Sequence, residues 1–271
     1  MQLFRLLTSL DDELTPERCK IHLACWNGID DPLDVYLAGD FDAWQAGQHR
    51  KNFERAFVLS LIALPGPDRW LFAGVHDSSG CEWDAGTECF RYNLRRRSRT
   101  DELDGRLVVA FKRPGRQSYL VAENWVDALQ VAEIRPEKMR VAKFPGYSKA
   151  MLTKQRLDIV VRQQVESWKA ALSAVSGVYV IADRLNGKLY VGSATAGEGI
   201  WSRWCSYSMT GHGGDLELKR LLKAEGAAYA DNFQFGVLEI ADTHASTEDI
   251  LARESYWKDL LLSRAHGYNA N

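Results

Sequence analysis

Short apolar runs separated by Gly, Pro and Asp follow one another between residues 53 and 122, which is the pattern of β-strands joined by turns. The strands are expected over residues 56–63, 70–76, 88–94, 106–112 and 118–122. Short strands in such a succession predict a small barrel or sandwich. Before them, Thr15-Pro16-Glu17 has the form of a helix start and Asn27-Gly28 that of a helix stop. A short helix over residues 15–26 is therefore expected.

The apolar period changes in the second half of the chain. From residue 152 to residue 172 the apolar positions follow a helical step, with Leu157, Val161, Val165, Trp168 and Leu172 on one face. Residues 177–192 form two β-branched runs around an Asp/Asn/Gly turn, which predicts a β-hairpin. Further elements are expected as a helix over 200–207, a strand over 233–240 and a helix that Ser246 and Asp249 begin as a capping box.

A chain of 271 residues fits two domains. We expect a β-rich domain over residues 1–150, a linker helix over 151–176 and a second module over 177–271. The fold class expected is α+β. The first domain is expected to be a small, barrel-like β-domain. The second is expected to contain a sheet flanked by helices.

The hairpin carries a paired motif. Gly177-Val178-Tyr179 and Tyr190-Val191-Gly192 resemble the signature of the GIY-YIG nucleases, with Val in place of each Ile and the family's eleven-residue step between the tyrosines. Arg203, Glu254 and Asn269 follow in the family's order, so the resemblance covers about the last hundred residues. It implies an α/β module with a three-stranded antiparallel sheet. The N-terminal domain resembles no family that we identify.

Glu254 interrupts an apolar helix stripe that contains Ile250, Trp257 and Leu261. An ionised carboxylate that faces a core needs a cation or a proton, because burying it alone costs several kcal/mol. A salt bridge to a nearby arginine is the structural alternative. The resemblance implies instead that Glu254 binds a single divalent metal ion, Mg²⁺ with Mn²⁺ as a substitute.

The resemblance assigns roles to the other motif residues as well. An arginine at the place of Arg203 faces the scissile phosphate in the family, although here the loop before it, Thr195–Gly199, is longer than in compact members. The remaining catalytic candidates are Tyr179 at the attacking water, Tyr207 four residues after the arginine, and Tyr190 and Asn269 as orienting groups. Simple packing is the alternative for each tyrosine. Asn271 is a second candidate for the terminal asparagine.

The net charge of −2 conceals two basic segments. Residues 91–116 hold nine Lys or Arg against three Asp or Glu, and residues 135–156 hold seven against one. Such segments are either solvated faces or phosphate contacts, and a neighbouring nuclease signature favours phosphate contacts. The candidate DNA-binding residues are Arg95, Arg96, Arg97, Arg99, Lys112, Arg113, Arg116 and, in a glycine-flanked loop, His212.

Aromatic residues alternate along two of the expected strands. Trp70 and Phe72 share one face of their strand, and Phe90 and Tyr92 share one face of theirs. Rings in such stripes usually fill a core. The alternative is a pocket that stacks a base flipped out of the duplex.

Targeting and cysteine patterns are those of a cytoplasmic protein. The longest apolar run, residues 56–64, is far shorter than a membrane span, and residues 1–10 lack a signal-peptide cleavage site. The five cysteines form no Cys-x-x-Cys pair. Cys19, His22 and Cys25 have a spacing that metal ligands show, but without a fourth partner they are expected to be buried side chains.

The sequence as a whole therefore predicts a Mg²⁺-dependent endonuclease that acts on double-stranded DNA. The leading hypothesis is a restriction or defence enzyme whose N-terminal domain chooses the target. Readout of a modified base and direct readout of a fixed site are the two alternatives for that choice. A homodimer on DNA would account for double-strand cleavage. The alternatives are a repair nuclease for damaged or branched DNA and a catalytically inactive DNA-binding regulator.

Overall fold

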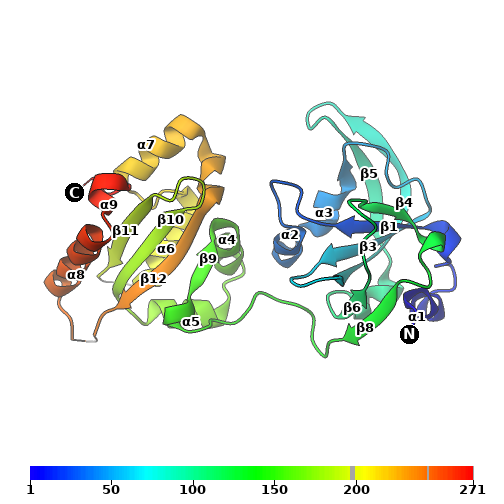
Figure 1. The fold of residues 1–271 in the computed structure, drawn as a ribbon, viewed down its shortest axis with the longest axis horizontal. Helices are drawn as coiled ribbons and strands as arrows, with labels where there is room; N and C mark the ends of the chain where they lie inside the picture. The colour runs from blue at the N-terminus through cyan, green and yellow to red at the C-terminus, as the bar shows by residue number, and fades with distance from the viewer. Residues whose placement is uncertain (196–198, 243, 271) are drawn as a thin grey trace. The chain divides into compact units, whose positions relative to one another are not determined.

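The computed structural model describes residues 1–195, 199–242 and 244–270. The chain divides into two compact units, Met1–Arg140 and Val141–Asn271 (Figure 1). Each unit combines a sheet with helices, which makes the fold α+β. Among the described residues, no helix has both the length and the apolar character needed to cross a membrane. Asn271 and part of the loop that precedes Gly199 lie outside the described residues.

In the N-terminal unit, whose residues are all described, eight strands form one bent sheet that resembles half of a barrel. The strand order is β2-β5-β4-β3-β1-β7, and β6 joins β4 to β8. β1 and β3 pair in parallel and the other neighbours are antiparallel. The strands are β1 (Cys19–Ala24), β2 (Gly47–Gln48), β3 (Phe57–Ala63), β4 (Arg69–Asp84), β5 (Cys89–Arg96), β6 (Leu107–Ala110), β7 (Tyr119–Val121) and β8 (Gln130–Ile134).

Apolar side chains cover both faces of this sheet because neighbouring positions alternate in direction. Leu61 and Phe72 belong to a core that includes helix α1, whereas Ile62 and Leu71 belong to a core with helices α2 and α3. The helices and helical turns of the unit are α1 (Leu3–Leu10), α2 (Pro32–Ala38), α3 (Phe41–Ala46), η1 (Pro16–Arg18), η2 (Ser98–Leu103) and η3 (Ala122–Asn124). The five expected strands correspond to β3, β4, β5, β6 and β7.

The expected helix over residues 15–26 is wrong. Thr15-Pro16 begins only the helical turn η1, and β1 follows at Cys19. Ile21 and Leu23 are buried in the core beside α1, which is the two-residue period of a strand. β1 pairs with β3 over its whole length, and this pairing stabilises the strand conformation more than the local helix-start signal favours a helix.

Strand β4 extends beyond the body of the sheet. β3 pairs with it only as far as Asp77, whereas β5 pairs with it as far as Asp84. A register shift between Ser78 and Cys81 separates the two parts. The ends of β4 and β5 therefore form a two-stranded ribbon, which projects as a long hairpin in Figure 1.

The C-terminal unit contains an antiparallel sheet with the order β11-β10-β12-β9 among its described residues. The expected hairpin and third strand are confirmed, and β9 adds a fourth strand by pairing with β12. Three strands were expected, because the three residues of β9 were assigned to a helix. The strands are β9 (Met151–Thr153), β10 (Gly177–Asp183), β11 (Leu189–Ala194) and β12 (Phe233–Ile240).

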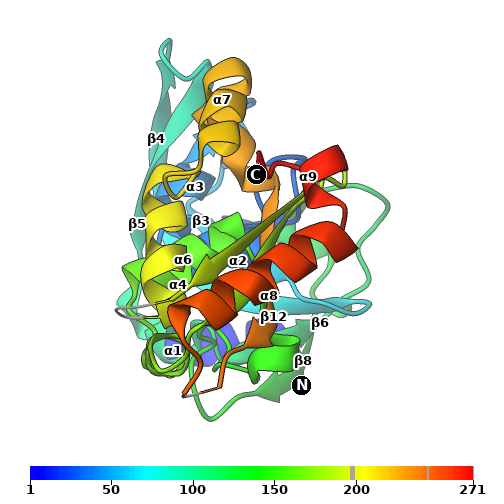
Figure 2. The same cartoon turned by 90° about the vertical axis from the view of Figure 1, so that its left-hand side faces the viewer.

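Helices pack around this sheet. α6 contacts β10 and β11 as well as α4 and α5, whereas α8 lies along β11 and β10 with α9 at its end (Figure 2). The helices and helical turns are α4 (Lys154–Arg162), α5 (Glu166–Ser173), α6 (Gly199–Thr210), α7 (Leu216–Glu225), α8 (Thr247–Leu260), α9 (Ser263–His266), η4 (Tyr147–Lys149) and η5 (Ala227–Asn232). The capping box of Ser246 and Asp249 is present at the start of α8.

Two helices stand where one linker helix was expected. Gln164 has a positive φ of 49° and separates α4 from α5. Leu157 and Leu172, one from each helix, are nevertheless buried in the same core of the C-terminal unit. The helical spacing of apolar residues continues from α4 into α5 because both helices pack on the same core. Residues 154–173 therefore contribute to the core of the C-terminal unit.

Candidate active site

Two tyrosines and an arginine meet between the hairpin and helix α6. Tyr179 on β10 and Tyr207 on α6 are fully buried, with their hydroxyl oxygens 3.2 Å apart. Arg203 Nε donates to the Tyr179 hydroxyl at 3.2 Å, and its guanidinium lies 5.7 Å from the centre of the Tyr207 ring. The ring of Tyr190 on β11 packs edge-on against Tyr207. The four side chains form one group, which we call the tyrosine cluster.

The tyrosine cluster keeps its phenols protonated. Burial raises the pKa of Tyr179 above its ordinary value, although the charge of Arg203 acts in the opposite direction. Burial also raises the pKa values of Tyr190 and Tyr207. Near neutral pH the hydroxyl of Tyr179 is therefore a neutral group beside a permanent cation.

Gly192 makes room for the Tyr179 hydroxyl. It pairs with Tyr179 across the hairpin, and a Cβ at this position would lie 2.6 Å from the hydroxyl oxygen. That distance is shorter than real Cβ contacts. The glycine of the second motif thus allows the phenol to lie across strand β11.

Glu254 lies on α8 and binds two side chains. Its Oε1 is 2.7 Å from Nζ of Lys258, one helical turn later, and its Oε2 accepts a hydrogen bond from the hydroxyl of Ser193. The side chains of Glu254 and Lys258 are only 13% and 15% exposed. The sequence predicted that the carboxylate of Glu254 is shielded from water and needs a cation. In the structure this cation is the ammonium group of Lys258.

Asn269 binds strand β11 through its amide. Val191 N–H donates to Asn269 Oδ1 at 2.8 Å, and Asn269 Nδ2 donates to the Val191 carbonyl at 2.8 Å. The residue is buried. Asn269 therefore continues the hydrogen bonding of the edge strand, and it holds strand β11 in its position at the site.

Four consecutive residues of β11 connect the parts of the site. Tyr190 joins the tyrosine cluster, Val191 is held by Asn269, Gly192 accommodates Tyr179, and Ser193 binds Glu254. The charge of Glu254 also raises the pKa of Tyr179, so the carboxylate and the phenol are within electrostatic range. The motif residues thus form one site along one strand.

The donor set fits a hard divalent cation. Glu254 supplies a carboxylate and Ser193 a hydroxyl, and Mg²⁺ is typically held by one or two carboxylates together with waters and substrate phosphates. Among the described residues, His, Cys, Asp and Glu form no group of three or more that could hold a metal ion. Glu254 and Ser193 together offer one carboxylate and one hydroxyl to such an ion.

His212 lies in a tight turn after α6. Its Nδ1 accepts a hydrogen bond from Gly214 N–H at 3.0 Å. A Cβ on Gly213 would lie 2.4 Å from the Tyr207 ring, so the turn packs directly on the tyrosine cluster. His212 stabilises this turn, and its contact with DNA stays a prediction.

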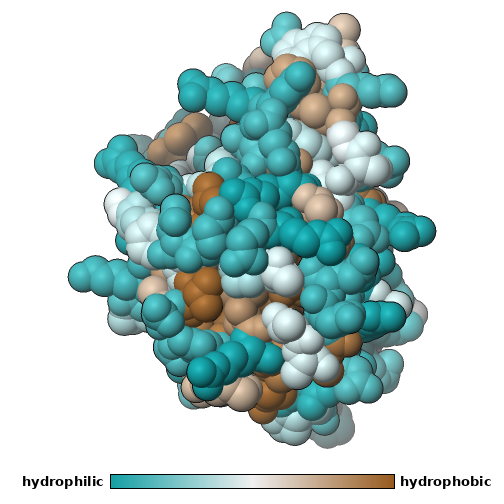
Figure 3. Space-filling model, turned by 90° about the vertical axis from the view of Figure 1, so that its right-hand side faces the viewer, coloured by the Kyte–Doolittle hydropathy of each residue, from teal (hydrophilic) through white to brown (hydrophobic). Residues whose placement is uncertain are grey.

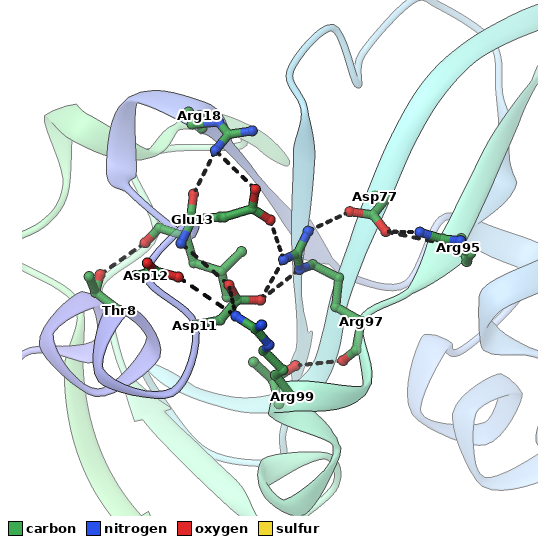
Figure 4. Close-up of polar contacts among 11 residues, drawn as sticks. Thr8, Asp11, Asp12, Glu13, Arg18, Asp77, Arg95, Arg97 and Arg99 are labelled. Carbon is green, nitrogen blue, oxygen red and sulfur yellow. Dashed lines mark hydrogen bonds and ion pairs between the residues drawn. The ribbon is translucent and has the colours of Figure 1, made fainter.

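Arg97 is the centre of an ion-pair network in the N-terminal unit (Figure 4). It pairs with Asp11 at 2.7 Å, Glu13 at 2.6 Å and Asp77 at 2.7 Å, and its own side chain is 14% exposed. Burial opposes ionisation of Asp11, but Arg97 holds the pKa of that carboxyl below its ordinary value. These contacts join the loop after α1 to strands β4 and β5.

The other arginines of the run also have carboxylate partners. Arg96 binds Asp42 at 2.9 Å, and Arg99 binds Asp11 at 3.2 Å. Arg95 is 85% exposed (Figure 4). All four arginines of the run thus have a carboxylate partner, but Arg96 and Arg97 are mostly shielded whereas Arg95, which pairs with Asp77 at 3.3 Å, and Arg99 remain largely exposed. The role of the run in phosphate contact stays a prediction.

The second group of candidate DNA contacts lies between β6 and β7. Arg113 donates to the backbone carbonyls of Arg116 and Gln117, which fixes the turn. Lys112 and Arg116 are exposed. The face of the N-terminal unit shown in Figure 3 is mainly hydrophilic, with hydrophobic residues in scattered groups.

Most of the candidate base-pocket rings lie in cores. Trp70 and Phe72 are buried beside α1, and Tyr92 is buried in a smaller cluster with Phe53. Phe90 is partly buried and packs edge-on against Trp83, which is 55% exposed at the end of the β4–β5 ribbon. Three of the four rings would need rearrangement to stack a base.

His22, Cys19 and Cys25 make contacts with other parts of the N-terminal unit or lie buried in it. His22 is buried in β1 and hydrogen-bonds Gln45 at 3.3 Å, with the ring of Tyr119 stacked 5.3 Å away. Cys19 is buried, and Cys25 lies 3.2 Å from Arg113. The expectation of buried side chains is confirmed for Cys19 and His22.

Sequence reasoning missed two residues of the site. Lys258 follows Glu254 by four positions, a spacing that places two side chains on one helix face and could have suggested the pair. Ser193 directly follows the second motif, but a lone serine carries no specific signal.

No family model matches the chain. Over 94 residues, which are 35% of this chain, the sequence is 33% identical to intron-associated endonuclease 1 of Enterobacteria phage T4. The matched stretch is 36% of that protein, so the chain spans about a third of the length of this curated relative.

Two solved structures of a catalytic domain are also similar. A mutant form of the catalytic domain of intron endonuclease I-TevI is 31% identical, with a TM-score of 0.28, and the match covers 36% of this chain and 94% of that one. A structure of the catalytic domain of homing endonuclease I-TevI is 32% identical, with a TM-score of 0.28, and the match covers 35% and 98%. A TM-score this low establishes no common fold, so the relation depends on sequence identity and on the order of the motif residues. About a third of this chain is thus a nuclease domain of the GIY-YIG family, homologous to the catalytic domain of I-TevI, and the rest of the chain is unassigned.

Proposed function

We propose that the chain is a Mg²⁺-dependent DNA endonuclease in which the N-terminal unit selects the target, as in a restriction or defence enzyme. The observation that carries the proposal is strand β11, whose residues 190–193 join the tyrosine cluster, Asn269 and Glu254 into one site. An inactive regulator would have no need to keep all of these contacts. The intact set therefore favours catalysis.

Hydrolysis of a phosphodiester needs a placed water and neutralisation of the charge that develops on the phosphate. Arg203 supplies a permanent cation beside the Tyr179 hydroxyl. Because burial keeps the Tyr179 phenol neutral, its role is to hold the attacking water through a hydrogen bond. Glu254 and Ser193 would hold the divalent ion, which supplies further positive charge and lowers the pKa of bound water.

Target selection is assigned to the N-terminal unit because a nuclease module of about a hundred residues has little surface for sequence readout. The exposed cations Lys112 and Arg116, together with Arg95, are the side chains of that unit we propose for phosphate contact. Buried Trp70, Phe72 and Tyr92 favour readout of a duplex over a preformed pocket for a flipped base.

The experiment is incubation of purified full-length protein and Mg²⁺ with plasmids that differ in base modification. Cleavage at a defined sequence in unmodified DNA supports a restriction enzyme, and cleavage of modified DNA alone identifies a modification-dependent one. Preference for nicked or branched substrates would indicate repair. Glu254→Gln, which keeps the shape of the side chain and removes its charge, should abolish cutting in every case and leave DNA binding intact. Mg²⁺-dependent cutting by Glu254→Gln within tenfold of wild type would contradict the proposed site.

A further inference from the structure

Glu254 already holds a cation that the chain itself supplies. Lys258 Nζ lies 2.7 Å from Glu254 Oε1, and the hydroxyl of Ser193 binds Oε2. Both carboxylate oxygens are therefore occupied by protein groups. Glu254 and Lys258 belong to α8 and Ser193 to β11, which are two of the elements that build the site.

The ion pair is shielded from water. The Lys258 side chain is as little exposed as that of Glu254, so water screens their attraction less than at a surface. Elsewhere in the unit, Lys154 and Asp158 form a pair with the same helical spacing at 2.6 Å, but Lys154 also donates to the Ser208 carbonyl and serves helix packing. Within the part of the chain that the structure describes, Glu254 is the acceptor that faces the Lys258 ammonium, so this ammonium is committed to the carboxylate.

From this arrangement, and resting on the proposed function, we propose that Lys258 is a competing cation that occupies Glu254 until a divalent ion replaces it and then turns to a phosphate of the DNA. A divalent ion and an ammonium cannot both lie against one carboxylate oxygen without repulsion. Metal binding therefore displaces Lys258 from Glu254. The displaced ammonium remains at the site and is attracted to the anionic substrate.

This exchange couples the two ligands. DNA that attracts Lys258 frees Glu254 for the metal, and metal on Glu254 frees Lys258 for DNA. Thermodynamic linkage requires the two effects to be equal in size. Competition from Lys258 would weaken metal binding to Glu254 in the absence of DNA. It would also leave the shielded carboxylate of Glu254 paired with a cation when no metal ion is bound.

The first test measures Mn²⁺ binding to the full-length protein by calorimetry without DNA. Lys258→Met removes the competitor and should bind Mn²⁺ at least about tenfold more tightly than wild type, because one unit charge in contact is removed from a shielded site. Lys258→Arg keeps a cation and should bind like wild type. Lys154→Met, the matched control, removes the lysine of the comparison pair with Asp158 and should leave Mn²⁺ affinity unchanged.

Folding is checked by thermal unfolding, and Lys258→Gln provides a second neutral variant that keeps a hydrogen-bond donor for Glu254. Equal or weaker Mn²⁺ binding by both neutral variants would overturn the proposal and make the pair purely structural. If neither wild type nor these variants bind Mn²⁺, either alone or together with duplex DNA, the metal role of Glu254 fails, and with it the proposed function and this inference. The two failures are thus distinguishable.

The second test measures the salt dependence of duplex DNA binding, with Tyr179→Phe added to every protein to suppress turnover. With Mn²⁺ present, Lys258→Met should show a shallower slope of log affinity against log salt than its parent, by about 0.9 because one phosphate is no longer neutralised. Without metal the two slopes should agree, since Lys258 is then held by Glu254. Equal slopes with metal present would show that Lys258 does not reach the phosphate.

Discussion

Asn269 binds Val191 through both groups of its side-chain amide, each at 2.8 Å. Val191 lies between Tyr190 and Gly192 on the edge strand of the sheet. The asparagine therefore satisfies two backbone groups that an edge strand would otherwise leave unpaired, and it fixes the position of β11 at the site. A residue near the C-terminus thus controls the placement of the motif.

Asn269→Ala should lower the free energy of unfolding by about 1–3 kcal/mol, because two buried backbone groups lose their partners. Cleavage should fall in well-folded protein as well, since Tyr190 and Ser193 are no longer held in place. Removal of residues 269–271 should have the same effect, whereas removal of residues 270–271 alone should be tolerated. Cleavage rate and thermal unfolding are measured on each truncated protein. Full activity in the protein that ends at residue 268 would show that Asn269 has no role.

Gly192→Ala should inactivate the enzyme more than it unfolds it. The added methyl would meet the Tyr179 hydroxyl at 2.6 Å and the Tyr190 ring at 2.9 Å. The phenol must then move away from Arg203, whose Nε now donates to it. Cleavage rate and thermal unfolding are measured together, with Gly236→Ala in β12 as the control, because a Cβ there would make only ordinary contacts, the nearest at 3.6 Å. Wild-type cleavage by Gly192→Ala would mean that the position of the hydroxyl is unimportant.

The C-terminal site was readable from the sequence because its parts are local patterns. The hairpin, the capping box at Ser246 and the shielded position of Glu254 each follow from a period or a spacing within one element. Lys258 and Ser193 could be assigned to the site only from their contacts with Glu254. The hydrophobic period within one element does not show which side chains are in contact. Strand β9 is three residues long and pairs with a strand about eighty residues later, so it carried no local signal.

The N-terminal unit was less readable for the same reason. Its strands were located from turn residues, but β1 was mistaken for a helix because its partner β3 lies far along the chain. The arginine run looked like a free basic surface in the sequence. Its carboxylate partners, Asp11, Asp42 and Asp77, come from distant segments and are gathered only by the fold.

Arg97→Met should destabilise the N-terminal unit by about 3–5 kcal/mol, because it leaves the buried carboxylate of Asp11 without its main partner. Arg95→Met is the matched control in the same run. Its side chain is largely exposed, so its removal should change the free energy of unfolding by less than about 0.5 kcal/mol. Denaturant titration of both variants makes the comparison. Equal effects would show that the network around Arg97 does not stabilise the fold.

Lys112→Ala combined with Arg116→Ala should weaken DNA binding without changing stability, since both side chains are exposed. The slope of log affinity against log salt should become shallower by about 0.9 for each phosphate that the protein no longer neutralises. An unchanged slope would place the DNA on another surface of the unit.

The last prediction concerns pH and the buried His22. Burial lowers the pKa of this histidine to about 4, despite its hydrogen bond with Gln45. Between pH of about 6.5 and 4 the unfolded chain binds a proton that the folded protein does not, so stability falls as the pH is lowered through this range. Below about pH 4 both states are protonated and His22 causes no further loss. The full effect is about 3 kcal/mol, from 1.36 kcal/mol for each unit of pKa.

The loss of stability that His22 causes at low pH can be separated from the loss that the carboxylates cause. The pKa values of Asp11 and Asp42 are held low by their arginine and histidine partners, against the effect of burial, so their stabilising contribution is lost only at pH values below about 4. His22→Phe keeps a ring in the stack with Tyr119, and Gln45 still accepts from Ser60 at 2.6 Å. Urea unfolding between pH 4.5 and 7.5 should therefore depend less steeply on pH in His22→Phe than in wild type, and His49→Phe, at an exposed position of the same unit, should behave like wild type. The same pH dependence in wild type and His22→Phe would contradict a neutral buried histidine in the folded protein.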